Sequence, residues 1–158
     1  MKNFLTRIPS GETLSSLLND VLSDDYVLRT KSRIFKWNIP ESGCEELRNF
    51  LEMQCRQLDS EMDLIAYRIK SLGHAPESRL RGLARKSNIR EYHAASFFPD
   101  DVIHELKRDH KALIDRIRHS IDSAQDHHDH TEYCDFLCGL LENHERMAWT
   151  LDALRYYN

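Results

Sequence analysis

Apolar side chains recur at helical spacing in four long segments of the chain. Within each segment they are separated by three, four or seven positions, which places them on one face of an α-helix. The four sets are Leu14, Leu17, Leu18, Val21, Leu28 and Phe35; Leu47, Leu51, Leu58, Met62, Ile65, Ile69 and Leu72; Val102, Ile103, Leu106, Leu113, Ile117 and Ile121; and Tyr133, Phe136, Leu137, Leu140, Leu141, Ala148, Leu151 and Leu154. We therefore predict four long amphipathic helices that share one core.

Three local signals predict where these helices begin and end. Pro40 ends the first helix, because the residue before a proline is disfavoured in the helical region. The Ser-x-x-Glu pattern from Ser42 to Glu45 predicts a capping box at the start of the second helix. Gly73 predicts the C-terminal end of that helix.

The segment between Gly73 and Pro99 predicts a long connection with a small helix inside it. Residues 78–86 have helical spacing, with Leu80 and Leu83 on the inner side. Two helices, a long crossover with a short helix, and two further helices describe an all-α, ferritin-like four-helix bundle better than a simple up-and-down bundle.

Composition indicates one soluble domain. The 158 residues, of which 41% are hydrophobic and 30% charged, suit a single domain over 1–158 with a short N-terminal extension at 1–9. The net charge of −4 argues against binding nucleic acid through overall charge. No apolar run approaches the roughly 18 residues of a membrane span. The four cysteines form no CxxC pair, so we expect reduced thiols and a cytoplasmic protein.

Three motifs resemble those of one known family. Residues 22–28 and 31–38 resemble the LxDxYxLxxKTRxxHWN run of the first helix of Dps proteins, and residues 58–73 are similar to their LDexxDxIAERIrxLG run. Asp135 with residues 144–151 looks like their last-helix pattern DLL…HEKxAWML. Because the motifs occur in order and at matching separations, the chain resembles a Dps-type mini-ferritin.

The resemblance implies a shell of twelve identical subunits that oxidises iron at sites shared between subunits and stores it inside; many members also bind DNA. The family's di-iron ligands are two histidines, an Asp and a Glu. The corresponding residues here are Lys36, Arg48, Asp63 and Tyr67, so one position matches. Ammonium and guanidinium groups offer hydrogen-bond donors and no lone pair for a metal, so these residues argue against the usual ferroxidase activity.

Two interpretations of this region remain open. In the first, Lys36 and Arg48 replace the charge of iron and pair with Asp63 and Glu52 across a dimer interface, so that iron is not bound at the usual, fully liganded site. In the second, iron is held by relocated ligands, Glu52, Asp59 and Asp63, with Tyr67 as a further candidate. A charged, solvated helix face is the plainer alternative to both.

Four further features have a structural and a functional interpretation. Asp135 falls where the family has a pore-lining acidic residue, but it also suits a helix N-terminus. Residues 126–130 (Asp-His-His-Asp-His) form either a metal-binding tract or a solvated loop. His110 and His144 lie at apolar stripes and suit hydrogen-bonded core positions. Trp37 and Trp149 are expected to be core or interface residues.

DNA is a weakly supported partner. The basic residues Arg79, Arg81, Arg85, Lys86 and Arg90 surround the small crossover helix and form either a phosphate contact or a solvated face.

Three functions follow. The first is a Dps-like shell protein for iron or oxidative stress, or for DNA protection, with the usual di-iron site lost or altered. The second is an active iron-oxidising and iron-storing enzyme with relocated carboxylate ligands. The third is a helical interaction module that forms no shell.

Overall fold

The computed structural model describes residues 11–93, 96–125 and 131–154. Within them the chain forms five helices and no strand: α1 (Gly11–Asn38), α2 (Glu45–Ser71), α3 (Leu80–Lys86), α4 (Pro99–Gln125) and α5 (Thr131–Leu154). The predicted all-α, ferritin-like four-helix bundle with a short helix in its crossover is confirmed.

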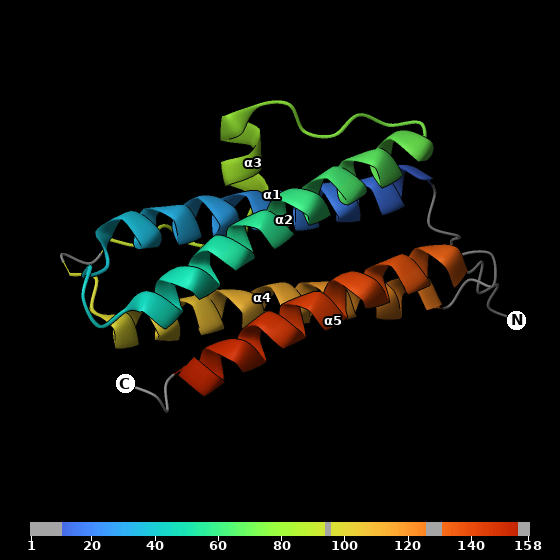
Figure 1. Ribbon diagram of the computed structural model, residues 1–158. Coiled ribbons are helices and arrows are strands. Elements are labelled where there is room, and N and C mark those ends of the chain that lie inside the picture. The colour runs from blue at the N-terminus through green and yellow to red at the C-terminus, as the bar shows by residue number, and fades with distance from the viewer. Residues whose placement is uncertain (1–10, 94–95, 126–130, 155–158) are drawn as a thin grey trace, which may run out of the picture.

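The four long helices form two antiparallel pairs. Helices α1 and α2 pack along each other, as do α4 and α5, and α3 lies against the outer side of α1 (Figure 1). Each long helix directs its predicted apolar stripe into the space between the pairs, where side chains such as Leu18, Leu58, Leu113 and Leu137 are fully buried. The centre of the bundle is therefore closed to solvent by all four helices.

The two ends of α2 differ in how their free backbone groups are hydrogen-bonded. Cys44 is the N-cap and makes no side-chain capping hydrogen bond, so the capping box predicted at Ser42 is wrong. At the other end Gly73 has φ +81°, which favours glycine, and its N–H donates to the Lys70 carbonyl at 3.0 Å. The N–H of His74 donates to the Ile69 carbonyl at 3.2 Å, which completes a Schellman motif and confirms the predicted end.

Buried ionic groups hold the crossover against α1 and α4. Asp24 accepts hydrogen bonds from the Ser87 hydroxyl at 2.8 Å and the Asn88 N–H at 2.7 Å, and pairs with Arg116 at 3.2 Å. Within the crossover Leu83 is buried as predicted, but Leu80 is 68% exposed, so its predicted inner position is wrong.

A second ionic cluster lies further along the same helices. The Lys31 ammonium donates to the Arg90 carbonyl at 2.9 Å, to Glu105 at 2.5 Å and to Asp109 at 2.6 Å. Both carboxylates and Lys31 are buried. The cluster therefore joins α1, the crossover and α4.

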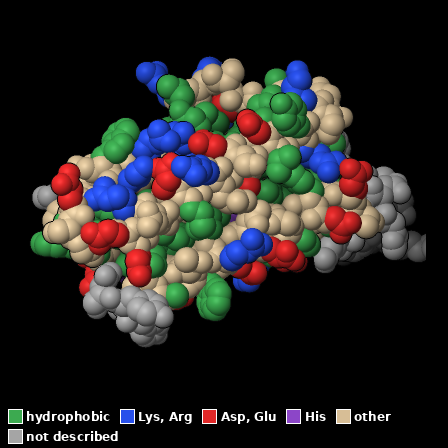
Figure 2. Space-filling model, in the orientation of Figure 1, with side chains coloured by type: hydrophobic (Ala, Val, Ile, Leu, Met, Phe, Trp, Pro, Cys, Tyr) green, Lys and Arg blue, Asp and Glu red, His purple; other side chains and the backbone are tan. Residues whose placement is uncertain are grey.

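The face over α2 and α5 mixes acidic and basic side chains with apolar ones (Figure 2). None of the described helices is long and apolar enough to cross a bilayer.

Candidate metal centre in the middle of the bundle

Three ionisable residues occupy positions on the apolar stripes. Asp25 lies between Val21 and Leu28 on α1, and Glu61 and His144 take equivalent places on α2 and α5. Because residues three or four apart share a helix face, the stripes turn these three side chains inward. The side chains of Asp25 and His144 are 0% exposed and that of Glu61 is 1% exposed.

The three side chains converge on one point. His144 Nε2 lies 3.2 Å from Asp25 Oδ1 and 3.3 Å from Glu61 Oε2, and one ligand atom from each residue lies within 4.8 Å of the others. Within the described residues, both oxygens of Asp25, Glu61 Oε2 and His144 Nε2 have no hydrogen-bond partner. Apart from one another, these buried groups have no partner in the described part of the chain that offsets the charge of two carboxylates, so the arrangement is suited to a bound cation.

Burial and mutual charge set the protonation of this cluster. Burial raises the pKa of Asp25 to about 6, with Glu61 and Asp24 adding to the rise and His144 opposing it. Burial lowers the pKa of His144, but the carboxylates of Asp25 and Glu61 outweigh it and raise that pKa to about 9. Without a metal, the imidazolium therefore compensates part of the negative charge at neutral pH.

The residues fit a divalent transition metal. Imidazole nitrogen and carboxylate oxygen are ligands for Fe²⁺, Mn²⁺ and Zn²⁺, and three protein ligands leave further coordination positions open. Two carboxylates also carry the negative charge that a divalent ion would balance. Among the described residues this is the only group of three or more His, Cys, Asp or Glu side chains that converges in this way.

A second layer of buried polar groups supports His144. His110 on α4 is fully buried, and its Nδ1 lies 3.1 Å from His144 Nδ1. Its Nε2 lies 3.0 Å from Gln54 Oε1, and Gln54 in turn donates to Ser32. On the other side Gln57 donates to Glu61 Oε1 at 2.9 Å, so only Oε2 of Glu61 faces the centre.

The positions expected from the Dps motifs lie elsewhere. Lys36 contacts Glu52 of the same chain, and Arg48 donates to the backbone carbonyls of Lys36 at 3.1 Å and Pro40 at 2.9 Å. Asp63 is exposed, and Tyr67 is 72% exposed. The pairing of Lys36 with Glu52 therefore occurs within one chain, and pairing across a dimer interface stays a prediction.

Two of the carboxylates predicted as relocated ligands are already paired with cations. Glu52 contacts Arg56 at 3.1 Å in addition to Lys36, and the Lys36 ammonium lowers the pKa of Glu52. Asp59 accepts two hydrogen bonds from Arg29, at 2.8 and 3.1 Å. Within a single chain these carboxylates do not gather with Asp63 into one site.

The other candidate features that the structure describes lie apart from the convergent group. Asp135 is exposed on α5, and its pore role stays a prediction. Arg81 and Arg85 are exposed, Arg79 pairs with Glu77 at 3.2 Å, and Lys86 is half-buried; DNA binding by this group stays a prediction. The histidine-rich tract at 126–130 lies outside the described residues.

Trp37 and Trp149 were expected to be core or interface residues. They are 70% and 73% exposed, which excludes the core alternative, and the interface alternative stays a prediction.

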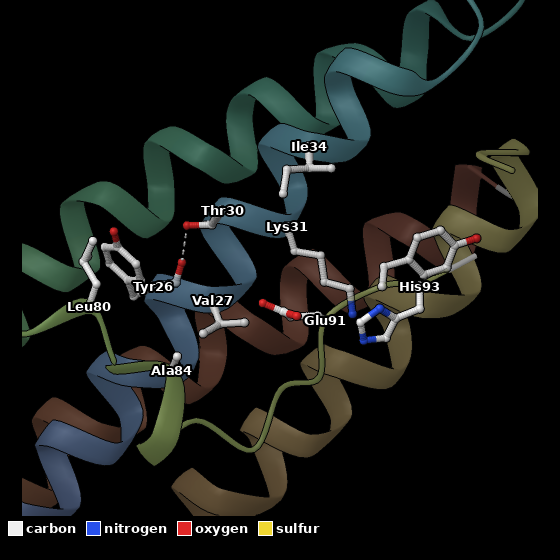
Figure 3. A pocket seen from close by; sticks show the side chains of 10 residues that line it. Tyr26, Val27, Thr30, Lys31, Ile34, Leu80, Ala84, Glu91 and His93 are labelled. Carbon is white, nitrogen blue, oxygen red and sulfur yellow. Dashed lines mark hydrogen bonds between the residues drawn. The ribbon is translucent and has the colours of Figure 1, made fainter. Parts of the chain in front are cut away.

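A separate pocket of about 370 Å³ opens on the outer side of α1. Figure 3 shows Val27 and Lys31 of α1 facing the crossover, with Leu80 and Ala84 of α3 at one side and His93 at the other, and Ile34 also lines the pocket. It contains none of Asp25, Glu61 and His144. The cavity and the convergent ligand atoms are therefore different features of the molecule.

Sequence reasoning missed Asp25 and Glu61, although both lie inside the quoted motifs. The available signal was their register: each is three or four positions from apolar residues on both sides, so each interrupts an apolar stripe with a carboxylate. His144 was expected to be a hydrogen-bonded core residue; it is buried and contacts His110, and it also belongs to the convergent group.

Known proteins of the same fold indicate the class to which this chain belongs. Residues 15–155 match the family model described as a ferritin-like domain, so the chain belongs to the ferritin-like family. Its fold is that of the Dps proteins, the mini-ferritins.

Solved structures show this likeness in detail. The Dps protein of Vibrio cholerae O1, described as a member of a broad superfamily of ferritin-like diiron-carboxylate proteins, has a TM-score of 0.84 at 23% identity and covers 92% of this chain and 90% of its own. A Dps protein of Bacillus brevis gives 0.84 at 21% identity, with 94% and 99% covered. A dodecameric thioferritin of Bacteroides fragilis gives 0.83 at 15% identity, with 92% and 86% covered.

A relative found by sequence has a higher sequence identity to this chain than these three proteins of known structure. An uncharacterized low temperature-induced protein of Nostoc sp. is 29% identical over 136 residues, which are 86% of this chain and 76% of that protein. An Anabaena variabilis homologue matches equally well.

Proposed function

We propose that this protein is an iron-binding mini-ferritin that takes up ferrous iron at the centre of each four-helix bundle. The observation that carries the proposal is the convergence of Asp25, Glu61 and His144, whose central atoms are buried and have no hydrogen-bond partner among the described residues. The ferritin-like family supports iron as the ion, because a Dps relative of the same fold is described as a diiron-carboxylate protein. Iron is here a substrate or cargo.

We further propose that the positions Lys36, Arg48, Asp63 and Tyr67 do not bind iron. Lys36 and Arg48 place positive charge there and are held by Glu52 and by backbone carbonyls. A cation would have to displace these contacts and face a guanidinium that does not lose its proton. We therefore favour the bundle centre over a site relocated to Glu52, Asp59 and Asp63.

We propose that the chain forms a homo-oligomeric shell. Among the residues that the structure describes, eight large apolar side chains are exposed on a single chain, including Leu64 at 52%, Leu80 at 68% and Tyr67 at 72%. Contacts between subunits would cover such side chains, since contiguous apolar surface marks protein interfaces. Native mass spectrometry should give a mass near twelve times 18.7 kDa; a monomer would favour the interaction module without a shell.

Iron binding can be tested with variants that keep side-chain volume. Anaerobic titration with Fe²⁺ should show about one tight site per chain, because the centre offers one converging set of ligands. Glu61→Gln and Asp25→Asn should remove that tight binding, since the amides keep the shape but lose the charge. Aerobic oxidation of Fe²⁺ should slow in the same two variants.

The matched controls are Asp63→Asn and Tyr67→Phe, at the positions that the Dps motifs indicate. These variants should bind and oxidise iron as the unsubstituted protein does. Loss of iron binding in Asp63→Asn together with normal binding in Glu61→Gln would contradict the proposal.

A further inference from the structure

A chain of hydrogen bonds leads from the backbone of α1 to His144, and its first bond has a fixed direction. The Ser32 hydroxyl lies 2.7 Å from the Leu28 carbonyl oxygen. A carbonyl accepts and cannot donate, so Ser32 is the donor in this bond. Its oxygen is then free to accept, and the Gln54 side chain lies 2.6 Å away. The group of Gln54 that faces Ser32 is therefore the NH₂ group.

The orientation of Gln54 sets the hydrogen of His110. With its NH₂ group on Ser32, Gln54 presents the carbonyl oxygen Oε1 to His110 Nε2 at 3.0 Å. An amide oxygen accepts only, so His110 Nε2 carries the hydrogen. In neutral imidazole the other nitrogen then has the free lone pair, so His110 Nδ1 is an acceptor.

The orientation of His110 sets His144 in the same way. The two Nδ1 atoms lie 3.1 Å apart, and one of them must donate. Since His110 Nδ1 is the acceptor, His144 Nδ1 is the donor. The second nitrogen of His144, Nε2, is the atom that faces Asp25 and Glu61 at 3.2 and 3.3 Å.

We propose that Ser32, Gln54 and His110 are positioning residues that hold the hydrogen of His144 on Nδ1 and so present the Nε2 lone pair to a divalent cation. This inference rests on the proposed function, because it concerns the same site. It assigns His110, which is buried beside the ligands, a supporting role and not that of a ligand. Three helices contribute: α1 with Ser32, α2 with Gln54 and α4 with His110.

The donor and acceptor order of these hydrogen bonds matters, because the opposite order would leave no lone pair on His144 Nε2 for a cation. If His110 carried its hydrogen on Nδ1, it would donate to His144 Nδ1. Neutral His144 would then carry its hydrogen on Nε2, pointing at the position of the cation. Supporting groups of this kind typically change metal affinity by about 10- to 100-fold when they are removed.

The test uses Zn²⁺ as a diamagnetic probe and two substitutions of Gln54 with similar shape. Gln54→Met removes the acceptor for His110 Nε2, whereas Gln54→Glu retains one. Calorimetric titration of the full chain should give Zn²⁺ binding about 10- to 100-fold weaker in Gln54→Met. Gln54→Glu should restore it to within a few-fold of the unsubstituted protein. Glu61→Gln lacks one proposed ligand, so the zinc that this variant still binds measures binding elsewhere on the chain.

A spectroscopic measurement separates positioning from a merely structural effect. In ¹⁵N-histidine NMR spectra of the zinc-loaded protein, His144 should show metal on Nε2 and hydrogen on Nδ1. If Gln54→Met does not fold, a second pair carries the test: His110→Asn keeps an acceptor near Nδ1 and should bind Zn²⁺ well, while His110→Leu should bind it weakly.

Two results would overturn the inference in different ways. In the first, Gln54→Met and the unsubstituted protein bind Zn²⁺ equally well and His144 still binds it through Nε2. This result would contradict the positioning role but would be consistent with the metal site. Zinc binding in the unsubstituted protein no tighter than in Glu61→Gln would remove the proposed metal site, and this inference with it.

Discussion

His144 is the residue on which the two states of the site depend. In the metal-free protein its imidazolium lies against two buried carboxylates, and in the proposed metal-bound state a cation would take that place. A ligand nitrogen must lose its proton before it binds a metal, so metal binding at this site competes with the proton.

The pH dependence of stability follows from this competition. The pKa of His144 is raised from 6.5 to about 9, so between these values the folded protein binds more protons than the unfolded chain. The contribution of His144 to stability is therefore complete below about pH 6.5 and is lost as the pH rises through about 9. Urea unfolding in the presence of a chelator should show stability falling over this range.

His144→Gln is the control for that experiment, because it removes this titration and leaves the other groups. Its stability should fall less steeply between pH 6.5 and 9 than that of the unsubstituted protein. Equal slopes in the two proteins would show that His144 is not paired with Asp25 and Glu61 in solution.

At the scale of the elements, the sequence predicted the helices better than their ends. The apolar stripes fixed four long helices, because burying an amphipathic face dominates the choice of secondary structure. The Schellman end at Gly73 was also predictable, because its conformation favours glycine. Ser42 was not an N-cap, since the polar pattern around it does not determine at which residue the backbone enters the helix.

Lys31 shows how one element is held to the next. Its ammonium lies between Glu105 and Asp109, and burial raises the pKa of Asp109 to about 6 although Lys31 opposes the rise. Lys31→Met would leave both carboxylates buried without this cation and should destabilise the fold by about 3–5 kcal/mol. Chemical denaturation measures the difference.

Lys111→Met is the matched control on α4. Its salt bridge with Asp115 is exposed, at 75% and 57% for the two side chains, so the loss should be under about 1 kcal/mol. Similar losses in the two variants would mean that the buried cluster does not hold the crossover in place.

Substitution of two glycines tests the end of α2 and the interior of α5. Gly73→Ala should destabilise the fold by about 1–2 kcal/mol, because φ is +81° there. Gly139→Ala lies inside α5 with no atom within 4 Å of the added Cβ, and should stabilise it by about 0.5–1 kcal/mol. Thermal unfolding of both variants measures this, and a stabilised Gly73→Ala would contradict the described end of α2.

For the molecule as a whole, the family resemblance predicted the fold correctly but did not predict that Asp25, Glu61 and His144 converge. It led to Lys36, Arg48, Asp63 and Tyr67, which are distributed over α1 and α2 of a single chain. Asp25, Glu61 and His144 are far apart in sequence, and their convergence depends on the relative rotation of three helices. The stripe register shows that each is turned inward, but not that they meet at one level of the bundle.

Anomalous diffraction from crystals soaked anaerobically with Fe²⁺ tests the central claim most directly. We predict one iron peak per chain in the middle of the bundle, bound by Asp25, Glu61 and His144 Nε2, with no peak beside Asp63 or Tyr67. Iron at Asp63 between two subunits, with no peak at the bundle centre, would contradict this account.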